Sequence, residues 1–210
     1  MNAMVDIFPA QGAKAAVPLR PKLKPADWIV AGFNALVDGG PEAIKVEALA
    51  RDLGATKGSF YWHFKDLRAF HAAMLEAFEQ LAAPGITSAI RRGGGPRLQM
   101  MRLVEAVSAL PEDECDGAAL EPSMRDWSRT DPMARETLAR VDARRLADLC
   151  AFLGEAGLDS TRASQGAVRF YAALLGLEAL RITCGVDMRG PLAAAALAIL
   201  EEGAADRREC

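Results

Sequence analysis

Apolar side chains recur every three to four residues along most of this chain, the spacing that lines one face of a helix. No stretch alternates apolar and polar residues as a half-buried strand would, so the pattern predicts an all-α protein. Prolines, glycines and capping residues set the predicted ends. We expect helices from residue 25 to the glycines at 39 and 40, over 46–53, from 57 to about 64, from 67 to just before Pro84, over 86–92, from 96, over 120–128, over 132–156, from 159 or 160 to about 184, and from 191, with a surface loop over 111–117.

The most informative stretch is residues 48–67, which predict two short helices joined by a tight turn. Leu49, Ala50 and Leu53 continue an apolar face that begins at Val46. Gly54 follows that face, where a left-handed residue commonly closes a helix. The first helix of the pair therefore ends at a glycine turn.

The second helix of the pair has one apolar and one polar side. Thr56 is placed to cap it, and Phe60 and Phe64, four residues apart, can be buried together. Two short helices joined by a glycine-containing turn form the helix-turn-helix pattern, whose second helix fits the major groove of DNA. An alternative is a helical hairpin packed inside the protein. An inward-facing helix would not carry Lys, Gly, Ser and His on one flank, so we favour the DNA-reading interpretation.

The sequence G-A-T-K-G-S-F-Y-W-H-F-K-D at residues 54–66 resembles the signature of TetR-type (tetracycline-repressor-like) transcriptional regulators. The resemblance covers roughly residues 25–75. It implies a three-helix DNA-binding domain followed by a larger helical domain for ligand binding and dimerisation. We accordingly expect a flexible arm over 1–22, the helix-turn-helix domain over 23–68 and the second domain over 69–210. Lys45 stands where the family usually has a capping Ser or Thr, which leaves open how this helix end meets the DNA backbone.

The residues expected to contact DNA lie on and beside the second helix of the pair. We expect Lys57 and Ser59 to read base edges, with Trp62 in apolar contact, while the others hold phosphates or let the backbone approach closely. The predicted DNA-contacting residues are Lys45, Thr56, Lys57, Gly58, Ser59, Tyr61, Trp62, His63 and Lys65. At the end of the N-terminal arm, Arg20, Lys22 and Lys24 either reach DNA or belong to a solvated tail.

The last two predicted helices carry more apolar surface than one core needs. The helix ending near residue 184 has one stripe containing Val168, Leu175 and Ile182 and a second containing Phe170 and Leu174. The resemblance implies that this helix and the last one pair with their copies in a homodimer. A monomer that buries both faces internally is the alternative.

The resemblance also implies a small-molecule inducer inside the second domain. Methionines and aromatics form adaptable apolar pockets, so an apolar or aromatic ligand is expected. The same residues are also compatible with an ordinary core. The candidate lining residues are Met100, Met101, Val104, Met124, Trp127, Cys150, Phe152, Phe170, Tyr171 and Leu174.

Charge and composition narrow the choice of function. The net charge is −3, but residues 20–68 hold eight Lys/Arg and six Asp/Glu, so this segment is +2 and the remainder is −5. Positive charge is therefore concentrated where DNA contact is expected, and counterion release there favours binding. No apolar run reaches the length of a membrane span, and the N-terminus lacks a secretory pattern, so a cytoplasmic protein is expected.

The sequence offers little for catalysis or metal binding. The four cysteines are widely spaced, and the two histidines, His63 and His71, have no third ligand beside them, so no metal site is expected. No catalytic triad, phosphate-binding glycine loop or cofactor motif is present, and we expect neither an enzyme nor a cofactor. The expected function is a ligand-responsive repressor that binds a palindromic operator as a dimer. The alternative is a ligand-sensing or scaffold helical dimer without specific DNA binding.

Overall fold

A computed structural model describes residues 23–82, 93–109 and 117–209, and the regular structure within these ranges is helical. The predicted all-α class is confirmed. The predicted arm, the predicted helix over 86–92 and the predicted loop up to residue 116 lie outside the described residues. The helices are α1 (Pro25–Gly39), α2 (Val46–Asp52), α3 (Lys57–His63), α4 (Leu67–Ala82), α6 (Pro96–Ser108), α7 (Gly117–Thr130), α8 (Pro132–Glu155), α9 (Ser160–Cys184) and α10 (Arg189–Glu209), with a short 3₁₀ turn, η1, at Pro41–Ala43.

Capping residues fix several helix starts as predicted. Asp66, Asp131 and Asp159 each accept a hydrogen bond from the backbone N–H three residues later, at 2.7, 2.9 and 2.9 Å. Two starts were predicted too late. The helix expected from 120 begins at Gly117, and the one expected from 191 begins at Arg189, whose N–H donates to the Asp187 carboxylate.

The buried face of α1 differs from the predicted one. Sequence periodicity indicated Ile29, Phe33, Leu36 and Val37, but Ile29 and Val37 are only half-buried, and Trp28 is completely buried instead. The reason is that the face is centred on Gly32. A Cβ at Gly32 would lie 2.7 Å from the Met74 sulfur, so α1 approaches α4 closely along that line.

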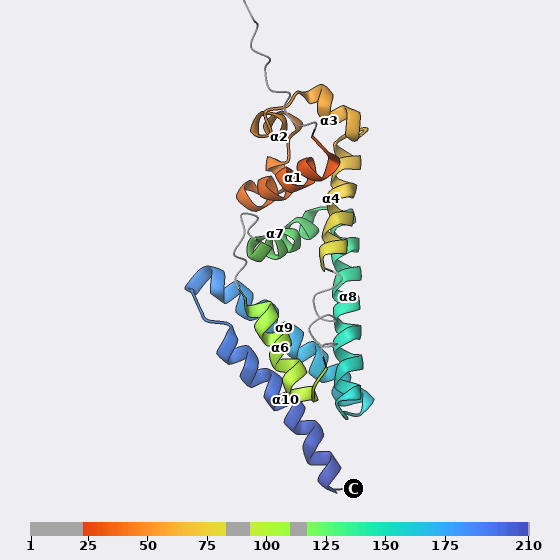
Figure 1. The fold of residues 1–210 in the computed structure, drawn as a ribbon, viewed down its shortest axis with the longest axis vertical. Coiled ribbons are helices and arrows are strands. Elements are labelled where there is room, and N and C mark those ends of the chain that lie inside the picture. Colours follow the sequence, from red (N-terminus) through yellow and green to blue (C-terminus); the bar gives the residue numbers. More distant parts are fainter. Residues whose placement is uncertain (1–22, 83–92, 110–116, 210) are drawn as a thin grey trace, which may run out of the picture.

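The helices form an elongated molecule with α1, α2 and α3 at one end (Figure 1). The helix α4 runs from this head toward the body, where α7 and α8 lie beside it, and α6, α9 and α10 make up the far end. Arg140 of α8 donates to the Glu79 carboxylate of α4 at 2.7 Å, which ties the connecting helix to the body. No helix among the described residues is long and apolar enough to cross a membrane.

Two clusters of buried side chains make up the core. One joins the head to α7 and the first half of α8 through α4, and the other lies among α6, α8, α9 and α10. His71 of α4 packs edge-on against Trp127 of α7, with ring centroids 5.1 Å apart. Burial lowers the pKa of His71, opposed by the Asp131 carboxylate. The head therefore shares its core with α7 and the first half of α8. The predicted boundary at residue 68 stays a prediction.

Candidate nucleic-acid interface

The turn between α2 and α3 has the geometry predicted for it. Gly54 adopts a left-handed conformation with φ of 60°, and the Ala55 N–H donates to the Ala50 carbonyl at 2.7 Å. The Thr56 hydroxyl then accepts a hydrogen bond from the Ser59 N–H at 3.2 Å. Gly54 adopts the left-handed backbone conformation that the turn requires, and Thr56 caps α3. Together they fix the direction of α3 relative to α2.

One side of α3 is held by a cluster of aromatic rings. Phe60 is completely buried, and its ring centroid lies 5.4 Å from Trp28, 5.3 Å from Phe64 and 5.2 Å from Phe70. The contacts with Trp28 and Phe70 are edge-to-face, which orients the rings as well as burying them. Burial of Phe60 and Phe64 was predicted from their spacing, but burial of Trp28 was not. Trp28 precedes Gly32 by four residues and Leu36 by eight, which marks it as part of the same helix face.

The opposite side of α3 is exposed. Tyr61 is 56% and Trp62 is 76% accessible, which is unusual for large aromatic side chains. Lys57 and Gly58 are exposed beside them, and Ser59 is half-buried. A Cβ at Gly58 would meet only the Thr56 hydroxyl at 3.7 Å, an ordinary contact, so packing within the chain does not require glycine there.

The basic residues predicted to contact DNA are all on the surface. Lys45 is the N-cap residue of α2 and makes no side-chain cap, as its identity predicts. Lys65 is exposed in the turn that precedes α4. Lys57 forms an ion pair with Glu47 of α2, and its hydrogen bond lowers the pKa of that carboxyl. Exposed pairs of this kind contribute little to stability, so Lys57 can exchange Glu47 for a DNA group at little cost.

Two predicted phosphate contacts already have partners within the chain. The Thr56 hydroxyl oxygen caps α3, and the His63 Nε2 lies 3.0 Å from the Leu23 carbonyl oxygen. With its Nε2 hydrogen donated to Leu23, a neutral His63 has no second N–H to offer a phosphate. The contact also fixes the start of the described chain beside the end of α3, which sequence spacing gave no means to predict.

The ten residues predicted to line a ligand pocket are not gathered in one place. Met124 and Trp127 belong to the cluster shared with the head, whereas Met100, Val104 and Phe152 belong to the far cluster. Phe170 and Tyr171 are buried in that far cluster, and Cys150 and Leu174 pack against it, while Met101 is half-buried on α6. The ligand-lining role of these residues stays a prediction.

A network of charged groups in the body was not anticipated. The Tyr171 hydroxyl of α9 donates to Asp142 of α8 at 2.7 Å and accepts from Arg125 of α7 at 2.9 Å and from Arg145 at 3.0 Å. Glu121 accepts from both arginines, at 2.7 and 2.9 Å. The network joins three helices that sequence spacing alone does not bring together.

Burial and hydrogen bonding oppose each other within this network. Burial would raise the pKa of Asp142, but hydrogen bonds from Arg125 and Tyr171 outweigh it and hold that pKa below its usual value. Burial raises the pKa of Tyr171 to about 12, so its hydroxyl keeps its proton at neutral pH. The network therefore keeps its charges through the neutral range.

One face of α9 is left uncovered in the single chain. Val168 is 54% and Ile182 is 56% accessible, and the small residues Ala172, Gly176 and Ala179 between them are exposed. The other face, with Phe170 and Tyr171, is buried in the body. On α10, Leu192, Ala196 and Ile199 are buried against the rest of the chain.

Within the described ranges, no group of three His, Cys, Asp or Glu side chains could hold a metal ion. Cys150 and Cys184 are free thiols, half-buried and exposed respectively. Cys115 and Cys210 lie outside the described residues.

The helix-turn-helix region matches a known protein family. Residues 29–74, which contain the helix-turn-helix, match the family described as bacterial regulatory proteins, tetR family. No protein among those with curated functions matches the sequence.

Solved structures share the fold of nearly the whole chain. A transcriptional regulator from Rhodococcus sp. Rha1 is 20% identical, with a TM-score of 0.72 over 86% of this chain and 97% of its own. A TetR transcriptional regulator from Legionella pneumophila is 13% identical, with a TM-score of 0.66 over 84% of this chain and 95% of its own. A proposed transcriptional regulator from Saccharomonospora viridis, in complex with choline, is 14% identical, with a TM-score of 0.66 over 84% and 93% of the two chains. Residues 29–74 therefore match the tetR family of bacterial regulatory proteins, and the chain shares the all-helical fold of these solved regulators.

Proposed function

We propose that this chain is a repressor that binds a near-palindromic DNA operator as a homodimer and is released by a small apolar or aromatic inducer. Proteins of this family are DNA-binding regulators and not enzymes. The observation that carries the proposal is the exposed aromatic and basic side of α3, held outward by the completely buried Phe60. A DNA-binding repressor works where the chromosome is, which in a bacterium is the cytoplasm.

The exposed side of α3 has the chemistry that a major groove requires. Lys57 and Ser59 offer hydrogen-bonding groups for base edges, and Trp62 offers an apolar surface for a thymine methyl. The open space at Gly58 lets the backbone approach DNA closely. Tyr61, Thr56 and His63, with Lys45 and Lys65 on either side, are the groups that we propose to hold phosphates.

Replacing Lys65 by alanine is expected to weaken binding to all DNA sequences alike, because a lysine–phosphate contact carries no sequence information. The slope of log affinity against log salt should fall by about one, since one fewer counterion is released. Gel shifts with the DNA upstream of the protein's own gene, at several salt concentrations, measure both effects.

Ser59→Ala is the contrasting variant for that experiment. It should change the preference among operator variants while leaving the salt slope unaltered. If neither variant changes DNA binding, α3 is not the reading helix. If the unmodified protein shifts no DNA, the alternative function gains support: a ligand-sensing or scaffold dimer, which the uncapped start of α2 at Lys45 also allows.

A dimer would place two reading helices in successive major grooves, about 34–36 Å apart. The exposed face of α9 is the surface that we propose for this pairing, together with α10. The apolar residues of this α9 face would be buried by a second copy of the chain, and its small residues permit two helices to approach closely.

Ile182→Glu is expected to convert the dimer to monomers, because pairing would bury an unpartnered carboxylate on the apolar α9 face. Light scattering measures the mass directly. Leu98→Glu changes a leucine that is also about half exposed but belongs to another helix, α6, and it should leave the mass unchanged. A dimer that survives Ile182→Glu would place the interface elsewhere.

A further inference from the structure

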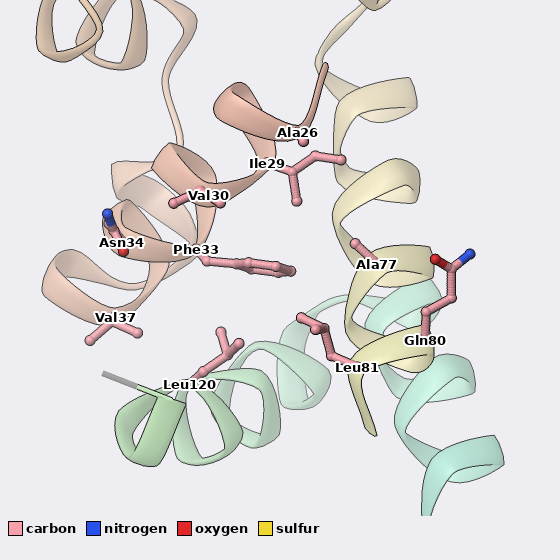
Figure 2. Close-up of a pocket in the computed structure, with 10 residues that line it drawn as sticks. All are labelled: Ala26, Ile29, Val30, Phe33, Asn34, Val37, Ala77, Gln80, Leu81 and Leu120. Atoms are coloured by element: carbon pink, nitrogen blue, oxygen red, sulfur yellow. The ribbon is translucent and has the colours of Figure 1, made fainter. Parts of the chain in front are cut away.

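A groove of about 650 Å³ lies between the head and the body, where α1, α4 and α7 meet (Figure 2). It is separate from the residues that the sequence indicated as a ligand pocket, and none of those ten residues lines it. Its volume falls within the range of small-molecule sites in proteins, roughly 300–1,000 Å³.

The groove is a wedge that opens where α1 and α4 separate. At Gly32 the two helices are in tight contact, since a Cβ there would lie 2.7 Å from the Met74 sulfur and 2.8 Å from the Phe70 ring. One or two turns further along α4, at Ala77 and Leu81, side chains of the two helices line the opening instead. Leu120 of α7 closes the third side (Figure 2).

The wall formed by α1 is apolar. Ile29 and Val37, which periodicity assigned to the core, face this groove with Phe33 and Val30. Figure 2 shows the Phe33 ring directed across the groove toward α4. Val30 is 44% accessible, so α1 presents apolar area that no described part of the chain covers completely.

The wall formed by α4 and α7 has the same character. Leu81 is 66% accessible, more than any other large aliphatic side chain described as exposed, and it lies beside Leu120 at the foot of the groove (Figure 2). Gathered exposed apolar residues mark binding sites more often than single ones do.

The lining restricts the chemistry of an occupant. It contains no charged side chain, and the polar groups of its side chains are the amides of Asn34 and Gln80. A charged molecule would lose hydration here without gaining a counter-charge, whereas a neutral apolar molecule would exchange water for hydrocarbon contacts. The Gln80 amide, whose nitrogen donates to Glu76 at 3.4 Å, could offer its oxygen to one hydroxyl group.

We propose that this groove binds a small neutral molecule, largely hydrocarbon and carrying at most one or two hydrogen-bonding groups. A molecule seated in the wedge presses α1 away from the foot of α4, while the tight contact at Gly32 acts as the pivot. The head turns relative to the body, so the site controls the direction of α3. This regulatory consequence rests on the proposed DNA-binding function, whereas the binding site itself does not.

A fluorescence titration of the full chain with N-phenyl-naphthylamine, a neutral apolar fluorophore, tests the site without DNA. Saturable binding of one molecule per chain is expected. Ala77→Phe fills the groove and Leu81→Gln makes its edge polar, and each should weaken binding by about tenfold. Leu98→Gln, an exposed leucine on α6 away from the groove, is the matched control and should bind the fluorophore as the unmodified chain does.

Leu81 is largely exposed, so Leu81→Gln keeps the test informative even if Ala77→Phe fails to fold. No saturable binding, or binding that Leu81→Gln leaves within about twofold of the original, overturns the proposal. A lower mass for Leu81→Gln than for the unmodified chain by light scattering also overturns it, because a second copy would then occupy the groove.

The regulatory consequence has its own measurement. The fluorophore should lower the affinity of the unmodified chain for operator DNA in gel shifts, and should have about tenfold less effect on Leu81→Gln at the same concentration. If the fluorophore binds but does not change the affinity for DNA, the groove is a binding site and the regulatory consequence is wrong. Fluorophore binding by a chain that shifts no DNA contradicts the proposed function and leaves the site intact.

Discussion

Replacing Phe60 by alanine is expected to destabilise the protein by about 3–5 kcal/mol and to abolish DNA binding. Phe60 is completely buried and contacts the rings of Trp28, Phe64 and Phe70, so its removal leaves a cavity at the centre of the head. A loss of this size is a large part of the roughly 5–15 kcal/mol that stabilises a typical domain. Urea denaturation followed by circular dichroism measures it.

Trp62→Ala on the same helix provides the comparison. Trp62 is 76% accessible, so its removal should change the unfolding free energy by less than about 0.5 kcal/mol while still weakening DNA binding. The two variants distinguish the two sides of α3, because Phe60 is buried and holds the helix in place, whereas Trp62 is exposed on the surface. Equal losses of stability in the two variants would show that the described orientation of α3 is wrong.

Asp142→Ala is expected to cost about 2–3 kcal/mol, because it leaves Arg125 and the Tyr171 hydroxyl without their shared acceptor. The expected loss is below that of a fully buried ion pair, since the Asp142 side chain is 29% accessible. The expected effect depends on pH. The pKa of Asp142 lies below its usual value in the folded chain, so the carboxylate stabilises the fold above about pH 4, and this contribution is lost as the pH falls through the folded pKa.

Denaturation of the unmodified chain and of Asp142→Ala, each at about pH 7 and about pH 3, measures both effects. The difference between the two proteins should shrink at the lower pH. Asp126→Ala is the control, because Asp126 forms only a surface pair with Arg129 at 4.0 Å and should cost less than about 1 kcal/mol. A loss no larger for Asp142 than for Asp126 would mean that the network does not stabilise the body.

Features that depend on neighbours along the chain could be predicted before the fold was known. Helix periodicity predicted the all-α class, and Gly54, Thr56, Asp66 and Asp131 predicted turns and caps because each acts within a few residues. The division of α3 into one apolar and one polar side was also predictable, because residues four apart lie on the same face of a helix.

Which apolar face packs against which partner could not be predicted, because it depends on the packing of whole helices. Periodicity assigned Ile29 and Val37 to the core, yet the close approach at Gly32 rotated α1 so that Trp28 is buried and the other two line a groove. The network around Tyr171 and the contact of His63 with Leu23 join positions 26 to 46 and 40 residues apart. Such contacts depend on how whole helices pack, and spacing along one helix carries no information about its neighbour's position.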